Sequence, residues 1–350
     1  MDKILTVVIP TYNMEKYLRK CLNSLIIEDK EIFDKVEVLV VNDGSKDASS
    51  SIAHEYQDNY PRVFRVIDKE NANYGSCVNR GLKEAKGKYI KILDADDSFA
   101  TTEFERYLNR LATIEVDMVL TPFYYVNETG NRTHFVKYKL PDSDNLTFDE
   151  VTPALLKQSI QMHATTYRTE AVRSINYVQT EGISYTDQEW VFTPLSAVNS
   201  IAYFNYPVYL YLLGREGQTM NAEIVKKNIS HKVICAQKII KDYVSFPQYG
   251  GSKQAIIDFK AIKTLEGPYL SYLVHYTDID KKDLMVYDAY VKNLSPALYA
   301  MTNNLKLSNT SYKYIEHWHE HPDTKIPTIY LLMSSFVGKY WTRIVGRFRS

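Results

Sequence analysis

Cysteine is scarce in this sequence, with only Cys21, Cys77 and Cys235 among 350 residues. The three are far apart and odd in number, and none belongs to a Cys-x-x-Cys or Cys/His cluster of the kind that binds zinc. A disulfide framework and a structural zinc site are therefore not expected. The pattern is typical of a protein that folds in a reducing compartment, so we expect a cytoplasmic location.

Excess charge of either sign is missing too, because 42 lysines and arginines balance 42 aspartates and glutamates. A protein that coats nucleic acid usually carries a clear basic excess, so no nucleic-acid partner is expected. The apolar run near the start ends at Pro10, which is too short for a signal peptide or a membrane span. At 45% hydrophobic residues the chain can still bury a full core.

Glycine-rich phosphate loops are also absent, since neither G-x-G-x-x-G nor G-x-x-x-x-G-K-[ST] occurs. Their absence disfavours a dinucleotide-dependent enzyme and a P-loop ATPase. No Ser/His/Asp or Cys/His arrangement for covalent catalysis stands out either.

What the sequence does contain is a regular alternation over its first hundred residues. Apolar, β-rich runs predict buried strands, and apolar residues at helical spacing follow each of the first three. Four strands alternating with three helices predict an α/β fold, with a mostly parallel sheet and helices on both faces. The expected strands cover residues 4–10, 36–43, 63–68 and 88–94, and the expected helices cover 14–27, 45–58 and 74–86.

The rhythm changes from about residue 117. Residues 117–126 and 133–140 read as antiparallel strands around a turn, and residues 200–213 read as further strand. After about residue 222 the pattern becomes helical. We predict an α/β domain over residues 1–220 and a mainly helical region over residues 221–350.

The segment 329–350 contains no acidic residue, and its cations Lys339, Arg343 and Arg347 recur every four positions. Aromatic and aliphatic residues fall mostly on the other side of a helix drawn through it. Such a helix could lie on an anionic membrane surface, which would make the protein peripheral to the inner face of the membrane. A terminal helix packed on the protein fits the pattern equally well.

Three carboxylates, Asp94, Asp96 and Asp97, stand within four positions at the end of the fourth predicted strand. In open α/β sheets ligands bind outside the carboxyl ends of the strands, and the second predicted strand ends with Asp43 at the same edge. Carboxylates suit Mg²⁺ or Mn²⁺, and such an ion commonly holds a nucleotide diphosphate. The alternative is a solvated acidic turn that caps the next helix.

Four stretches in order, "VVIPTYNMEKYLRKCLNSL", "VEVLVVNDGSKDAS", "ENANYGSCVNRGLKEAKGKYIKILDADD" and "YTDQEW", together resemble family 2 glycosyltransferases of the Rossmann-like GT-A fold. The resemblance is close over residues 3–100 and looser to about residue 220. It implies metal-dependent transfer of a sugar, with inversion, from a nucleotide-sugar, usually UDP-linked. The acceptor would be a saccharide or lipid-linked hydroxyl in the synthesis of cell-surface polysaccharide or glycoconjugate, and the oligomeric state is open.

The resemblance also implies roles for single residues around the donor. Asp94 and Asp96 match the Asp-x-Asp pair that binds the metal, Mn²⁺ or Mg²⁺, and Asp94 would also touch the ribose. Asp97 would face the donor sugar or the acceptor. The remaining donor contacts implied are Pro10, Thr11 and Tyr12 along the base, Asp43 on the base edge and Asn79 nearby. The family often has an Ala-Arg pair before that asparagine, where this chain has Cys77-Val78. Arg80 or Lys83 could replace the missing arginine.

Asp187 of "YTDQEW" matches the family's general base, with Thr186 where a glutamate is common. Glu189 is a rival base, and a helix N-cap is the structural alternative for Asp187. Arg215 could reach the diphosphate or lie in a surface loop, and His163 could contact the acceptor or be purely structural. A sugar-phosphate nucleotidyltransferase and a non-catalytic sugar-binding or scaffold protein remain the functional alternatives.

Overall fold

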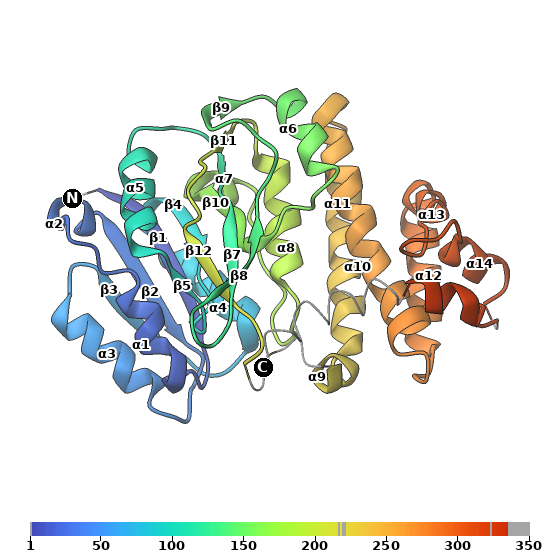
Figure 1. Cartoon of the computed structure of the whole chain (residues 1–350), viewed down its shortest axis with the longest axis horizontal. Helices are drawn as coiled ribbons and strands as arrows, with labels where there is room; N and C mark the ends of the chain where they lie inside the picture. Colours follow the sequence, from blue (N-terminus) through green and yellow to red (C-terminus); the bar gives the residue numbers. More distant parts are fainter. Residues whose placement is uncertain (1, 216–217, 219–221, 323, 335–350) are drawn as a thin grey trace. The chain divides into compact units, whose positions relative to one another are not determined.

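The computed structural model describes residues 2–215, 218, 222–322 and 324–334. The chain forms two compact units, one of residues 1–221 with 247–257 and the other of residues 222–246 with 258–350. The predicted α/β class is confirmed: a large sheet surrounded by helices occupies the first unit, and the second unit is helical (Figure 1). The predicted division at residue 220, into a catalytic domain and a mainly helical C-terminal region, stays a prediction.

The large sheet has eight strands in the order β3-β2-β1-β4-β10-β6-β11-β9. The first four strands in this order, β3, β2, β1 and β4, are parallel to one another and coincide with the four predicted strands. On the other side of β4, β10 runs antiparallel to both β4 and β6. The strands span Lys3–Thr11 (β1), Val36–Asn42 (β2), Phe64–Asp68 (β3), Gly87–Ile92 (β4), Met118–Leu120 (β6), Ser143–Leu146 (β9), Thr165–Arg168 (β10) and Ile201–Tyr203 (β11).

Helices link and cover these strands, and close packing against the sheet depends on small residues. Helix α4 (Asn73–Glu84) packs against β1 and β2. A Cβ atom on Gly81 of this helix would lie only 2.3 Å from Cγ1 of Val8 in β1, so only glycine permits this approach. The other helices of this part are α1 (Glu15–Asn23), α2 (Lys30–Phe33), α3 (Ser49–Asn59), α5 (Thr101–Leu111), α6 (Phe148–Leu155), α7 (Thr169–Ser174) and α8 (Asp187–Phe192).

A second, smaller sheet has the order β5-β12-β7-β8. Its strands are β5 (Ser98–Phe99), β7 (Phe123–Val126), β8 (Arg132–Val136) and β12 (Tyr209–Leu212). The predicted antiparallel hairpin is present as β7 and β8. Two predicted single strands were wrong in extent, because residues 117–126 and 200–213 each divide between the two sheets. A proline, Pro122 or Pro207, lies at each division, where it interrupts the ladder of backbone hydrogen bonds.

The second unit consists of helices, in agreement with the predicted pattern. They are α9 (Ala222–Lys227), α10 (Ile229–Ser245), α11 (Gly251–Leu270, whose start belongs to the first unit), α12 (Lys282–Leu294), α13 (Pro296–Thr302) and α14 (Tyr314–Glu320). Of the predicted amphipathic segment 329–350, residues 329–334 are helical, and residues 335–350 lie outside the described part of the chain. Among the described helices, none combines the length and the apolarity that crossing a bilayer requires.

Candidate active site

A cavity of about 690 Å³ opens at the carboxyl ends of β1, β2 and β4. Predicted site residues at the end of each of these strands line the cavity, because parallel strands end at the same edge of the sheet. Residues from much later in the chain complete the lining. The predicted residues that line it are Pro10, Thr11 and Tyr12 at the end of β1, Asp43 after β2, Asp94 after β4, His163 before β10, Asp187 at the start of α8, and Arg215 after β12.

Asp43 is almost fully buried and organises the loop before α4. Its Oδ1 accepts hydrogen bonds from Lys69 Nζ at 2.5 Å and the Ala72 amide at 3.0 Å, and its Oδ2 accepts from the Asn73 amide at 2.9 Å. A carboxylate has about four acceptor sites, so these three donors leave roughly one for a ligand N–H. The geometry is therefore compatible with the predicted contact to a nucleobase edge.

Asp94 is the acid of the 94–97 turn that lines the cavity. Its Oδ1 accepts a 2.8 Å hydrogen bond from the hydroxyl of Tyr74, which also lines the cavity. Burial, with repulsion from Asp96, raises the pKa of Asp94 to about 7. A cation in the cavity would favour the charged form of this carboxyl group.

Asp96 does not line the cavity, and its carboxylate forms an ion pair with Arg215 Nε. Both side chains of the pair are only 11% exposed. Arg215 itself does line the cavity, so Asp96 fixes a cationic group in the wall. Arg215 lies in a loop, as the alternative prediction had it, but its side chain is largely shielded from solvent by the pair with Asp96.

Asp97 is not among the residues that line the cavity, and it ties the turn to the second sheet. It accepts hydrogen bonds from the Tyr209 hydroxyl at 2.6 Å and the Leu212 amide at 2.7 Å. Burial, and then the proximity of Asp96, raises its pKa well above the ordinary value. The contacts of Asp97 are those of a group that positions the turn.

One group of potential metal ligands is found among the described residues: atoms of Asp94, Asp97 and His163 that all lie within 4.8 Å of one another. Burial lowers the pKa of His163 to about 3, so its imidazole is neutral, as a ligand must be. Its Nδ1 is buried and has no hydrogen-bond partner in the described part of the chain. Carboxylate and neutral imidazole together fit a divalent cation such as Mn²⁺. Of the two predicted metal ligands, Asp94 and Asp96, this group contains Asp94 and not Asp96.

Asp187 and its rival Glu189 lie in different surroundings. Asp187 lines the cavity, and its Oδ2 accepts a 2.9 Å hydrogen bond from the Gln188 side chain. Glu189 is fully buried, does not line the cavity, and accepts a 2.8 Å hydrogen bond from the Thr180 amide. The geometry thus favours Asp187 as the acid that could meet a substrate.

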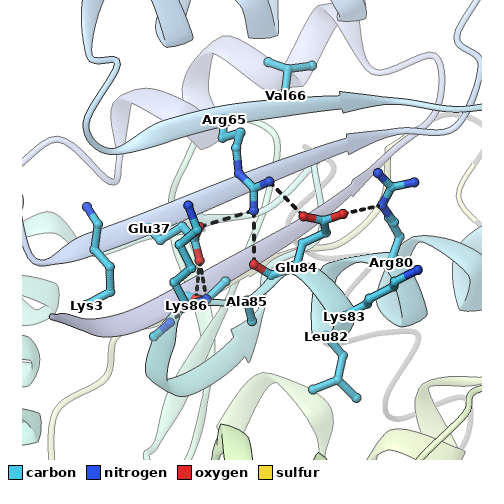
Figure 2. Close-up of polar contacts among 12 residues, drawn as sticks. Lys3, Glu37, Arg65, Val66, Arg80, Leu82, Lys83, Glu84, Ala85 and Lys86 are labelled. Atoms are coloured by element: carbon cyan, nitrogen blue, oxygen red, sulfur yellow. Dashed lines mark hydrogen bonds and ion pairs between the residues drawn. The ribbon is translucent and has the colours of Figure 1, made fainter.

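Asn79 and Arg80 on α4 are not part of the cavity lining. Asn79 Nδ2 donates to the Gln179 carbonyl at 2.9 Å, and the Gln179 amide donates to Asn79 Oδ1 at 2.8 Å. Arg80 donates a hydrogen bond to the Glu84 carboxylate, which also accepts one from Arg65. Arg65 in turn donates to Glu37, so the four side chains form one network (Figure 2). Their predicted contacts with the donor stay predictions.

Several lining residues were not singled out from the sequence. Tyr74 and Asn73 lie inside the quoted "ENANYG" stretch, and Tyr185 lies beside Asp187, so proximity to the motifs was the available signal. Asn13, Asn73 and Tyr185 all line the cavity with positive φ, at 53°, 72° and 69°. Such backbone conformations are uncommon for residues other than glycine and tend to cluster at functional sites.

Comparisons with known proteins agree with this architecture. The family model described as "Glycosyl transferase family 2" matches residues 6–172. An uncharacterized glycosyltransferase of Mycoplasma pneumoniae, the MG025 homolog, is 32% identical over 219 residues, which are 62% of this chain and 70% of that protein. Glycosyltransferase GlyA of Streptococcus pneumoniae is 29% identical over 212 residues, 60% of this chain; the match spans only 28% of the length of GlyA.

Solved structures share the fold. Staphylococcus aureus TarS 1–349 in complex with UDP-GlcNAc superposes with a TM-score of 0.63 at 19% identity, covering 91% of this chain and 92% of that one. The mannosyltransferase PcManGT of Pyrobaculum calidifontis, in complex with GDP-Man and Mn²⁺, superposes with a TM-score of 0.51 at 16% identity, covering 96% and 87%. These structures show the GT-A fold of glycosyltransferases, and the family match together with the Mycoplasma relative shows that this chain belongs to glycosyl transferase family 2.

Proposed function

We propose that the protein transfers a sugar from a UDP-linked donor to the hydroxyl group of an acceptor, with inversion at the anomeric carbon. The acceptor is a saccharide or a lipid-linked saccharide of a cell-surface polysaccharide or glycoconjugate. The observation that carries the proposal is that Asp43, Asp94, Asp187 and Arg215 line one cavity, although they come from four distant segments of the chain. TarS, whose fold is similar, is solved with UDP-GlcNAc, and this supports a UDP-linked donor.

In this proposal the nucleotide lies along the end of β1. Pro10, Thr11 and Tyr12 contact the base, and the remaining acceptor site of Asp43 receives a base N–H. Arg215, fixed by Asp96, donates charge-assisted hydrogen bonds to the diphosphate.

Asp94 would hold a divalent cation, Mn²⁺ or Mg²⁺, together with Asp96 as the motif implies or with His163 and Asp97 as their proximity allows. When bound, the cation neutralises charge on the departing diphosphate. Tyr74 keeps the Asp94 carboxylate oriented toward the cavity. PcManGT, whose fold is similar, is solved with GDP-Man and Mn²⁺, and this supports a divalent metal in the proposal.

Asp187 acts as the general base. Its carboxylate accepts the proton of the acceptor hydroxyl while the hydroxyl oxygen bonds to the anomeric carbon and the bond from that carbon to the diphosphate breaks. The Arg215 side chain is only 11% exposed, and this low exposure strengthens its interaction with the negative charge that develops on the leaving group.

A thermal-shift panel of nucleotide-sugars with Mn²⁺ tests the donor class, because a bound donor raises the melting temperature by mass action. We expect UDP-sugars to stabilise the protein more than GDP-, CDP- or ADP-sugars. UDP release, measured with and without acceptor, then separates transfer from simple binding. Stabilisation by no nucleotide-sugar at all would refute the proposal and favour a scaffold protein.

A further inference from the structure

A row of aromatic side chains crosses the second sheet from the cavity to the surface. Tyr211 of β12, Tyr125 of β7 and His134 of β8 are direct cross-strand neighbours. Their ring centroids are 5.3 Å apart from Tyr211 to Tyr125 and 5.6 Å apart from Tyr125 to His134. Neighbours paired in this way lie on the same face of a sheet, so the three rings form one continuous strip.

The inner end of the strip belongs to the active-site cavity. Tyr211 lines that cavity, and the His163 ring, which also lines it, stacks on Tyr211 with centroids 4.2 Å apart. Exposure increases outward: Tyr211 and Tyr125 are half-buried, and His134 is exposed. A ligand on the strip would thus extend from solvent toward the carboxylates of Asp94 and Asp187.

We propose that this strip binds the sugar rings of a saccharide acceptor and directs its terminal hydroxyl group into the cavity. The inference rests on the proposed transferase function and specifies the acceptor class. A pyranose ring has an apolar C–H face that stacks on an aromatic ring, and polar edges that suit the phenol hydroxyls and the imidazole. An acyl chain would instead be matched by aliphatic side chains, which none of the three strip positions carries.

The opposite face of the same hairpin offers a matched control. Tyr124 and Phe135 are paired there with centroids 4.5 Å apart, and Phe135 is 40% exposed. Because successive side chains of a strand point to opposite faces, this pair is not part of the strip. Phe135→Leu therefore removes an exposed ring from β8, the strand that also carries His134, but from the opposite face.

The test uses the full chain and four disaccharides, cellobiose, maltose, lactose and chitobiose, as probes. Saturation-transfer NMR reports which sugar C–H groups lie close to the protein, and the variants show whether those contacts depend on the strip. We expect at least one disaccharide to receive saturation in the wild type and to bind about tenfold more weakly to Tyr125→Leu and to His134→Ala, with affinity unchanged in Phe135→Leu. His134 is exposed, so its replacement leaves folding intact even if Tyr125→Leu fails to fold.

Two results would overturn the acceptor strip: no disaccharide receiving saturation, or equal losses in His134→Ala and Phe135→Leu. The melting-temperature rise with UDP and Mn²⁺, measured on the same samples, distinguishes this failure from a failure of the proposed function. If the disaccharide results reject the strip but the rise persists in every variant, binding of UDP stays supported. No rise in the wild type rejects the proposed function itself.

Discussion

The hydroxyl of Tyr74 donates a 2.8 Å hydrogen bond to Oδ1 of Asp94, and both residues line the cavity. Tyr74 stands in the first turn of α4, and Asp94 follows β4, so the bond joins the helix to the strand end that carries the acidic turn. A hydrogen bond to a charged group contributes about 1.5–3 kcal/mol. The contact therefore determines how the Asp94 carboxylate is presented to a ligand.

Removing that hydroxyl should slow the reaction. We expect Tyr74→Phe to lower the rate of donor-dependent UDP release by about tenfold, since roughly 1.4 kcal/mol of positioning energy corresponds to that factor. Tyr107→Phe is the control, because it deletes a buried phenol hydroxyl that donates to Thr166 Oγ1 at 2.7 Å outside the cavity lining. Equal rates for Tyr74→Phe and the wild type would mean that Asp94 needs no positioning by Tyr74.

Replacing the proposed general base should cost more. Asp187→Asn retains the size of the side chain but cannot accept the acceptor proton, so we expect turnover to fall about a hundredfold or more. Asp96→Asn should cause a loss of similar size, because it removes the partner that fixes Arg215. Initial rates of UDP release in the presence of acceptor measure both.

Glu189→Gln separates the two candidate acids. Because Glu189 is buried against the Thr180 amide, its replacement should lower the melting temperature and leave turnover per folded molecule within a few-fold of the wild type. Full activity in Asp187→Asn, combined with loss of activity in Glu189→Gln, would assign the base to Glu189.

Arg215 should discriminate a diphosphate from a nucleoside. We expect Arg215→Gln to weaken binding of UDP about tenfold or more, because charge-assisted hydrogen bonds to the diphosphate are lost, and to leave uridine binding unchanged. Isothermal titration of UDP and uridine, each with Mn²⁺, measures the two affinities. Equal weakening for both ligands would show that Arg215 supports the cavity as a whole.

The packing of α4 on β1 makes a prediction about stability. In Gly81→Ala the new methyl group would lie 2.3 Å from Val8 Cγ1, so we expect a loss of about 1–3 kcal/mol in unfolding free energy. Gly267→Ala, inside α11, meets no atom within 4 Å apart from its own helix backbone and chain neighbours, but Pro268 follows it and disfavours a Cβ there, so we expect a smaller loss than for Gly81→Ala. Chemical denaturation of the two variants measures both losses, and an equal loss would mean that the contact with Val8 does not limit the packing of α4.

The sequence by itself determined the order of the first four strands and three helices. Apolar side chains can share one buried face when they repeat about every two residues in a strand or every 3.6 residues in a helix, and this spacing can be seen in the sequence. It also placed Asp43 and Asp94 at one sheet edge, since parallel strands deliver their carboxyl ends together. Only the tertiary structure decided the partners of these groups. The Asp96–Arg215 pair spans 119 positions, and the division of residues 117–126 and 200–213 between two sheets depends on which strands meet in space. Such contacts depend on packing between segments that are distant in the sequence, so the local pattern of apolar residues does not predict them.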